Sequence, residues 1–298
     1  MVLEVKNVTK KFRKKLAVDN VSLKIPTGII GLLGANGAGK TTLMKMIADI
    51  LKPTSGEILY DGKNIHLMGE AYRDLFGFLP QEFGFDHNFT VKNYLEYIAA
   101  LKDVPAKETV GKIDHLLKLV SLSDVKNKKI IKLSGGMKRR VGIVQTLLND
   151  PKILVMDEPT AGLDPGERIR FRNLIFEFSH NRSVIISTHI VSDIENVAKQ
   201  IFLMKAGKII DSGSVNELVK KVEGKIWSSV IPANQFPTYA EQLQIIYQRE
   251  EGNNQMVIRY LSDKAQLNGA VSVSPSLEDL YFWLFPQDSK WSMKENVF

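Results

Sequence analysis

A glycine-rich loop is the part of this sequence best suited to chemistry. Residues 34–42 read Gly-Ala-Asn-Gly-Ala-Gly-Lys-Thr-Thr and fit the pattern G-x-x-x-x-G-K-[ST]. The apolar run 29–33 precedes the loop as an expected buried strand, and apolar residues at helical spacing follow over 43–50. A strand, a glycine loop and a helix in this order bring backbone N–H groups together around an anion. The loop therefore predicts a phosphate site, and the alternative is a turn that merely caps a helix.

Lys40 and Thr41 end this loop and give the phosphate site its expected chemistry. The Lys40 ammonium would reach the β- and γ-phosphates of a nucleotide, and the Thr41 hydroxyl would ligate Mg²⁺. Asp157 and Glu158 follow the apolar run 153–156, which is typical of a central parallel strand. Two carboxylates at the end of a buried strand are costly unless positive charge lies near them. We expect Asp157 to support the Mg²⁺ ion and Glu158 to polarise a water molecule.

Gln81 and His189 stand at the ends of two other expected strands. Gln81 ends the segment 76–81, and His189 comes just after the apolar strand 184–187. Ligand-facing residues of open α/β sheets collect at the carboxyl ends of the strands. A lone histidine is usually structural, but His189 recurs at the same strand-end position as Gln81 and Asp157. We therefore expect these three side chains to lie around one ligand.

Three further positions carry weaker signals. Residues 134–136, Ser-Gly-Gly, lead into a helix whose N–H groups and dipole suit an anion, and an ordinary helix cap is an equally good interpretation. Asp164 is placed to cap the helix that starts at Pro165, with or without a functional role. Phe12 lies in a basic cluster, where its ring could stack on an adenine or pack at a strand edge.

The elements that must position these residues form a mixed α/β set. Alternating apolar residues predict two antiparallel strands over 3–9 and 17–25, ahead of the glycine loop. Helical spacing predicts an inserted helical subdomain over about 90–148. The composition changes after the first 218 residues, where turn residues are frequent and strands are short. We therefore predict a main domain over 1–218 and a C-terminal accessory region over 219–298.

Composition limits the classes of function. The 298 residues include no cysteine, which excludes disulfides, thiolate metal sites and cysteine nucleophiles and suits a reducing cytosol. No apolar run approaches the roughly 18 residues of a transmembrane helix, and the N-terminus lacks the apolar core of a signal peptide. The formal net charge is +7, and one basic cluster runs over 126–140. Such a cluster suits nucleic acid, a polyanionic ligand or an anionic membrane face, although a solvated surface is the simplest interpretation.

Taken in order, these motifs resemble those of ATP-binding cassette (ABC) ATPases over residues 1 to about 218. The resemblance rests on the phosphate loop, Gln81, the Leu-Ser-Gly-Gly segment 133–136, the segment 153–158, the Ala-Gly-Leu-Asp segment 161–164 and His189. It implies an α/β fold with a P-loop NTPase mononucleotide-binding core, an antiparallel β subdomain and an inserted α-helical subdomain. Here a small C-terminal α+β extension follows that core.

The resemblance also implies roles for individual residues. Lys40, Glu158 and His189 would be catalytic, with Glu158 as the general base. Mg²⁺ would be held by Thr41 and Gln81, with Asp157 supporting its shell. ATP would be bound by Phe12, Val18, Asn36, Gly37, Ala38, Gly39, Lys40, Thr41, Thr42, Gln81, Ser134, Gly135, Gly136 and Asp164.

In this family two chains sandwich two nucleotides head to tail, so the resemblance implies a homodimer or a pairing with a second ATPase subunit. Ser134 and Gly136 would then complete the partner's site, and Asp164 would lie at the seam. The run after residue 136 and the Pro-Ser-Leu-Glu-Asp segment 275–279 resemble those of ATPases of bacterial exporters and multidrug-resistance transporters. This resemblance implies a cytoplasmic subunit, peripheral on the inner face of the membrane, that drives a separate permease. Two departures are Phe12 in place of the usual tyrosine and Met137 in place of the common glutamine.

Two other functions compete with this interpretation. A soluble ABC ATPase acting on ribosomes or nucleic acid would suit the basic face. Translation-type members generally carry two cassettes in one chain, however, and DNA-repair members carry coiled coils or zinc modules. We therefore expect no nucleic-acid partner. A catalytically idle cassette is disfavoured because the catalytic residues named above are intact.

Two phenylalanines after Gln81 bear on the permease. Phe83 and Phe85 lie where the expected sheet meets the helical insertion. We expect them to line a groove that receives a cytoplasmic helix of the permease. The alternative is that they pack inside the helical subdomain, because burial is the default for aromatic residues.

Overall fold

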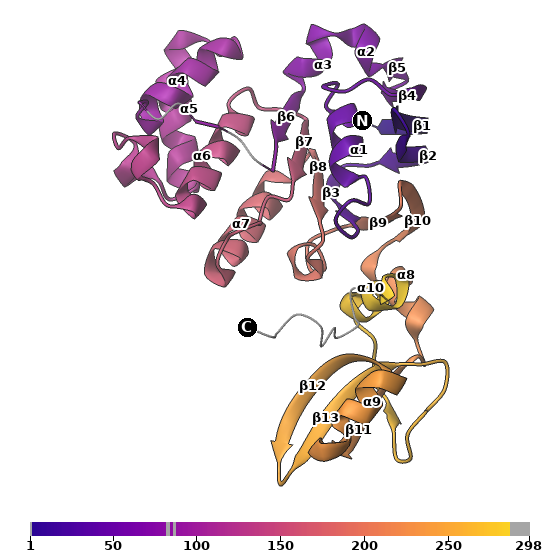
Figure 1. Cartoon of the computed structure of the whole chain (residues 1–298). Coiled ribbons are helices and arrows are strands. Elements are labelled where there is room, and N and C mark those ends of the chain that lie inside the picture. Colours follow the sequence, from indigo (N-terminus) through magenta and orange to yellow (C-terminus); the bar gives the residue numbers. More distant parts are fainter. Residues whose placement is uncertain (1, 82–83, 86–87, 287–298) are drawn as a thin grey trace. The chain divides into compact units, whose positions relative to one another are not determined.

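The chain folds into two compact units (Figure 1). The computed structural model describes residues 2–81, 84–85 and 88–286. The first unit is Met1–Ser212 and the second is Gly213–Phe298. The helix that begins at residue 215 therefore falls in the second unit, whereas the sequence had suggested a division after residue 218.

An antiparallel sheet opens the first unit. Its strand order is β2-β1-β4-β5, formed by β1 (Leu3–Phe12), β2 (Lys15–Ile25), β4 (Ser55–Tyr60) and β5 (Lys63–Asn64). The β1–β2 pairing was predicted from the alternating apolar residues, and it is confirmed. It sets Phe12 directly across from Lys15 at the end of the hairpin.

A second sheet is parallel from β9 to β6 and contains the strands that the expected site residues follow. Its order is β10-β9-β3-β8-β7-β6, formed by β3 (Gly28–Leu33), β6 (Phe76–Leu79), β7 (Ile153–Asp157), β8 (Ser183–Thr188), β9 (Gln200–Lys205) and β10 (Lys208–Gly213). Strands β7 and β8 are buried at every position, as continuous apolar runs in parallel sheets usually are. Because β3, β8, β7 and β6 are parallel neighbours, the residues that follow them meet at one edge.

Helices connect and cover these strands. Helix α1 (Lys40–Ile47) leaves the glycine loop and buries its apolar side chains in a core shared with both sheets. Helices α2 (Ile65–Met68) and α3 (Glu70–Asp74) lead into β6. Helix α7 (Pro165–Phe178) joins β7 to β8, and the 3-10 turn η3 (Val191–Asp193) follows β8.

The predicted helical insertion is confirmed. It consists of α4 (Val91–Leu101), η1 (Ser123–Val125), η2 (Ile130–Lys132), α5 (Ala106–Leu119) and α6 (Gly135–Leu147). The Thr90 side chain caps α4 by accepting a hydrogen bond from the Asn93 N–H at 3.2 Å. Ser134 caps α6 in the same way, through the Met137 N–H at 3.2 Å. Local capping residues therefore fix where both helices begin.

The aromatic segment between β6 and α4 is described in part. The Phe85 ring is half-buried and meets the Tyr94 ring of α4 edge-on, with 5.0 Å between ring centres. This contact favours packing inside the helical subdomain for Phe85. Phe83 lies outside the described residues.

The second unit is a small α+β fold, as predicted. Its antiparallel sheet has the order β12-β13-β11-β14, formed by β11 (Ile226–Pro232), β12 (Gln244–Gly252), β13 (Gln255–Leu261) and β14 (Val271–Ser272). A small core joins this sheet to α9 (Phe236–Gln242). The unit also contains α8 (Val215–Val219), η4 (Lys220–Val222), η5 (Ala233–Gln235) and α10 (Leu277–Leu284). In the part of the chain that the structure describes, every helix is too short or too polar to cross a bilayer.

A partly buried ammonium in the helical insertion makes stability depend on pH. The Lys102 Nζ donates hydrogen bonds to Asn149 Oδ1 at 2.8 Å and to the Thr146 carbonyl at 3.4 Å. Burial, assisted by the positive charge of Lys112, lowers the Lys102 pKa from 10.5 to about 8. Between those two pH values the unfolded chain binds more protons than the folded chain. The free energy of unfolding therefore gains a contribution that rises with pH in this window.

We predict that Lys102→Met removes this contribution. One proton gives a slope of at most about 1.4 kcal/mol per pH unit, so the parent should gain stability relative to Lys102→Met between about pH 8 and about pH 10. Urea unfolding across this range measures the difference. Lys107→Met, at an exposed position of α5, is the matched control and should follow the parent. Parallel curves for the parent and Lys102→Met would contradict the prediction.

Candidate active site

The glycine loop between β3 and α1 packs against its neighbours because two of its residues lack side chains. At Gly39 φ is +107°, and a Cβ atom would come within 2.4 Å of the Ala17 carbonyl oxygen. At Gly34 a Cβ atom would lie 2.2 Å from the Met204 carbonyl oxygen. The loop therefore lies directly on β2 and β9. Its tip at Gly37 stays exposed, where a ligand can reach the backbone.

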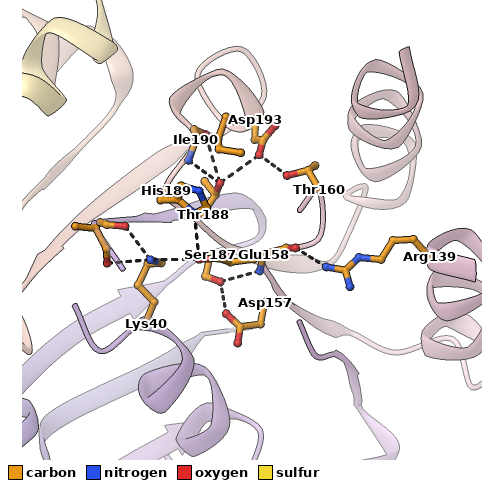
Figure 2. A network of polar contacts seen from close by, with 12 residues as sticks. Lys40, Arg139, Asp157, Glu158, Thr160, Ser187, Thr188, His189, Ile190 and Asp193 are labelled. Carbon is orange, nitrogen blue, oxygen red and sulfur yellow. Dashed lines mark hydrogen bonds and ion pairs between the residues drawn. The ribbon is translucent and has the colours of Figure 1, made fainter. Parts of the chain in front are cut away.

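The Lys40 side chain is enclosed by this loop and is only 5% exposed. Its Nζ donates hydrogen bonds to the carbonyls of Gly34 at 2.8 Å and Ala35 at 3.2 Å. The same Nζ lies 3.6 Å from Glu158 Oε1 (Figure 2). Burial lowers the Lys40 pKa, and the carboxylates of Glu158 and Asp157 oppose that shift. A buried ammonium at the edge of a glycine loop is well placed to bind a polyanion.

A pocket of about 310 Å³ opens beside this ammonium. Its wall combines the glycine loop, the start of α1, part of β2 and the residues just after β6 and β7. The lining residues are Lys15, Ala17, Asn36, Gly37, Gly39, Lys40, Thr41, Thr42, Gln81 and Glu158. Two ammonium groups, two hydroxyls and a glycine backbone in one pocket suit a polyphosphate.

Asp157 and Glu158 end β7 and face different partners. The Asp157 carboxylate is 1% exposed and accepts a hydrogen bond from the Ser187 hydroxyl. Glu158 instead lines the pocket, with Oε1 3.2 Å from His189 Nδ1 and 3.6 Å from Lys40 Nζ. The two carboxylates therefore diverge, and only Glu158 of the pair reaches the pocket wall.

The backbone of Glu158 is strained. Its φ is +44°, in the left-handed region that costs a residue with a side chain about 1–3 kcal/mol. Its N–H donates to the Ser187 hydroxyl at 3.0 Å and to the Ser187 carbonyl at 3.1 Å. Its carbonyl accepts a hydrogen bond from the Arg139 guanidinium. The strained residue is therefore held on both sides by neighbouring elements.

A polar network fixes the turn that carries His189. Thr188 Oγ1 accepts a hydrogen bond from the Ile190 N–H at 2.9 Å and donates one to Asp193 Oδ2 at 3.2 Å. Thr160, in the turn after β7, donates to the same buried carboxylate (Figure 2). The turns after β7 and β8 are thus joined, which keeps His189 beside the Glu158 carboxylate.

Four residues of this network were missed as site residues by the sequence analysis: Arg139, Thr160, Ser187 and Asp193. Two of them leave a signal in the sequence. Ser187 is a polar residue within an otherwise apolar strand. Arg139 stands four residues before Ile143, so it falls on the buried face of α6. A charged residue at a buried helical position usually requires specific partners.

The Ser-Gly-Gly segment and Asp164 lie outside this pocket. Among the described residues that line it, Ser134, Gly135, Gly136 and Asp164 do not occur. Ser134 is the exposed cap of α6. Asp164 caps α7 as predicted, accepting a hydrogen bond from the Glu167 N–H at 2.8 Å. One chain therefore does not bring these residues to its own pocket.

The remaining predicted residues differ in their exposure. Phe12 is 44% exposed at the end of β1, and the Lys10 Nζ lies 5.3 Å from its ring centre. Ala38 is buried within the glycine loop. The prediction that Val18 contacts the nucleotide is not supported, because its side chain is fully buried in the core. Neighbouring residues of a strand face opposite sides, and here Ala17 faces the pocket.

Known proteins with similar sequences carry the same kind of domain. A family model described as ABC transporter matches residues 18–161. The uncharacterized ABC transporter ATP-binding protein YxlF of Bacillus subtilis (strain 168) is 36% identical over 230 residues, which is 76% of each chain. The Nod factor export ATP-binding protein I of Burkholderia lata is 30% identical over 299 residues, covering 95% of this chain and 96% of that protein.

Solved structures agree with these sequences. The dimeric structure of MJ0796, a bacterial ABC transporter cassette, matches with a TM-score of 0.66 at 26% identity, over 71% of this chain and 98% of that one. A post-hydrolysis state of MJ0796 bound to ADP and Pi matches with a TM-score of 0.65 at 27% identity, over the same shares of the two chains. The fold and the site define a P-loop ATPase domain that binds ATP. The chain belongs to the ABC transporter ATP-binding proteins.

We predict that Lys40→Ala strongly weakens nucleotide binding. Removing one partner of a buried, hydrogen-bonded charge pair costs about 2–5 kcal/mol, which is about a 30-fold or larger loss of affinity. Titration with a fluorescent ATP analogue measures the loss. Lys45→Ala, at an exposed position of the same helix, is the matched control and should bind like the parent. Hydrolysis by Lys40→Ala at nearly the parent rate would remove this lysine from the site.

Proposed function

We propose that this chain is the ATP-hydrolysing subunit of an exporter, paired with a second ATPase subunit and attached to a separate permease. The observation that carries the pairing is the position of Ser134, which caps α6 at the surface and lies outside its own chain's pocket. Ser134 belongs to the family-typical Leu-Ser-Gly-Gly segment but does not line the pocket of its own chain. It is therefore well suited to complete the nucleotide site of a second chain. The MJ0796 cassette, which resembles this chain, is dimeric.

The glycine loop and Lys40 would hold the phosphates of ATP. Thr41 and Gln81 line the same pocket, so they would hold a Mg²⁺ ion, which neutralises charge on the β- and γ-phosphates when bound. Asp157 is buried and does not line the pocket, so it would support the coordination shell of Mg²⁺ indirectly. No three histidine, aspartate or glutamate side chains of the described residues gather into a metal cage. That suits Mg²⁺, which takes few protein ligands and completes its shell with phosphate and water.

Glu158 would act as the general base. Its carboxylate is buried between the Lys40 ammonium and the His189 ring, and it lines the pocket. It would accept the proton of the attacking water, while Lys40 and His189 bind the phosphate oxygens. Positioning and charge stabilisation of this kind supply most of the rate in phosphoryl transfer.

Similar proteins support a permease partner and transport in the export direction. The Nod factor export ATP-binding protein I resembles this chain over 95% of its length. CbiO1 of Clostridium perfringens, part of the transporter complex cbiONQ, matches with a TM-score of 0.64 at 30% identity. We therefore place the chain on the inner face of the membrane, where ATP is available, beside a membrane-spanning partner chain. Co-purification of that partner from membranes with the full-length chain tests this placement.

Glu158→Gln separates nucleotide binding from chemistry. The amide keeps the shape of the carboxylate but cannot accept the proton, and loss of a placed base costs about 10²–10⁴-fold in rate. We predict that the variant binds ATP and accumulates as a nucleotide-bound dimer that barely hydrolyses. Gel filtration with ATP and a phosphate-release assay measure both properties. Turnover near the parent rate would exclude the base role, and failure to bind ATP would assign Glu158 to the binding of Mg²⁺ or phosphate.

Ser134→Asp tests the pairing without removing the helix cap. Aspartate caps helices about as well as serine, so α6 should keep its start. The added negative charge would repel the γ-phosphate on the partner chain. In the Glu158→Gln background we predict that Ser134→Asp still binds ATP but no longer dimerises. Ser123→Asp, exposed in the same helical insertion, is the matched control. Dimerisation equal to the control would contradict the placement of Ser134 at the partner's nucleotide.

A further inference from the structure

The guanidinium of Arg139 joins three parts of the first unit. Arg139 lies on α6, and its side chain is buried. Its Nε donates a hydrogen bond to the Pro159 carbonyl at 2.7 Å, and its Nη1 donates one to the Gln81 carbonyl at 2.7 Å. Its Nη2 donates to the carbonyl of Glu158 (Figure 2). All three nitrogens of the guanidinium are thus used on backbone carbonyls outside its own helix.

Those carbonyls belong to the segments that carry the reaction. Gln81 comes just after β6, and Glu158 comes just after β7. Both residues line the nucleotide pocket, whereas Arg139 is not among the described residues of its wall. Arg139 would therefore act through these two residues rather than on ATP itself. The planar fork of a guanidinium fixes the relative positions of its acceptors, which a single ammonium cannot do.

The contact with Glu158 falls at the strained point of the site. Glu158 has a positive φ, and such a conformation persists only where neighbours over-determine it. On its N-terminal side the clamp is Ser187 of the parallel sheet. On its C-terminal side the clamp is Arg139 of the helical insertion. Movement of α6 would therefore act directly on the backbone of Glu158.

Helix α6 begins with the Ser-Gly-Gly segment at the protein surface. Ser134 is exposed as its cap, and Arg139 follows about 7–8 Å along the helix axis. In the paired arrangement proposed above, the start of α6 would meet the nucleotide of the partner chain. One rigid helix then connects the partner's nucleotide with the base and the Gln81 segment of its own chain.

We propose that Arg139 is a positioning residue that links α6 to Glu158 and Gln81, so that hydrolysis in one site depends on how α6 engages the other. The positioning part stands on the contacts within one chain. The coupling part rests on the proposed pairing of two ATPase subunits. Binding of ATP does not require the link, because the glycine loop and Lys40 are held by β2, β3 and β9.

The test compares Arg139→Met with Arg140→Met. Methionine fills much of the arginine volume but donates no hydrogen bond to the three carbonyls. Arg140 is its neighbour on α6, and it bonds the Val120 carbonyl at 2.9 Å and pairs with Glu167, away from the pocket wall. We expect kcat of Arg139→Met to fall about 10–10²-fold, because small displacements of catalytic groups have effects of that size. The KM for ATP should stay within about threefold of the parent value, since the glycine loop and Lys40, which would hold the phosphates, are held by β2, β3 and β9.

Dimerisation and rescue complete the test. In the Glu158→Gln background, Arg139→Met should still form the ATP-bound dimer, so that assembly no longer leads to hydrolysis. Arg139→Gln keeps two N–H donors and should recover part of the lost kcat. Arg140→Met should keep the parent kcat even where its melting temperature falls.

Several outcomes would overturn the proposal. Turnover of Arg139→Met within about twofold of the parent, or an equal loss in Arg140→Met, would make Arg139 an ordinary packing residue. If Arg139→Met does not fold, Arg139→Gln decides by the same comparison of kcat with KM, and parent turnover there rejects the link. If Glu158→Gln stays monomeric with ATP, the pairing and the coupling both fail. The kcat of Arg139→Met then still judges the positioning of Glu158 within one chain.

Discussion

The buried ion pair between Lys40 and Glu158 is the constraint on which the rest of the site depends. The Lys40 side chain is 5% exposed and the Glu158 side chain 11% exposed, and their charged atoms lie 3.6 Å apart. Taking two charges out of water is costly unless hydrogen bonds complete their shells. The loop carbonyls do this for the ammonium, and His189 does it for the carboxylate. The glycine loop, the strand ends and the turn after β8 are therefore held in a single arrangement by electrostatics as well as by packing.

The second feature of the site is a cation on each side of Glu158. The side-chain carboxylate faces Lys40, and the backbone carbonyl faces Arg139. Burial lowers the Arg139 pKa, and the negative charges of Asp157 and Glu158 counter the shift. Lys40 stands at the start of α1, after the glycine loop, and Arg139 stands on α6 of the helical insertion. Relative movement of the glycine loop and the helical insertion would therefore change the surroundings of Glu158 from one side only.

Local patterns in the sequence were sufficient for the strands and helices that carry the site and for most residues of the pocket wall. The glycine loop, the buried strand before Asp157 and the caps at Ser134 and Asp164 each depend on residues within a few positions of one another. The fully buried Val18 shows the limit of this reasoning, because a family-typical position does not reveal which face of β2 it occupies. The contacts of Arg139 with Gln81 and Glu158 span 58 and 19 positions, and the Thr160–Asp193 bond spans 33. Such contacts arise only when strands and helices far apart in sequence are packed together.

Ser134 and Arg139, at the cap and in the second turn of α6, have different surroundings. The cap at Ser134 is exposed and forms no part of the wall of its own pocket, whereas Arg139 is buried against the strand ends of its own chain. If α6 served only the stability of the insertion, an apolar residue would suffice at position 139. The neighbouring buried positions of α6 are apolar, as at Val141 and Ile143. A buried guanidinium is an expensive way to pack a helix, but it gives directional bonds that apolar residues cannot give. Those bonds end on the backbone carbonyls of Gln81, Glu158 and Pro159. The buried charge of Arg139 therefore fixes the positions of two residues of the pocket wall.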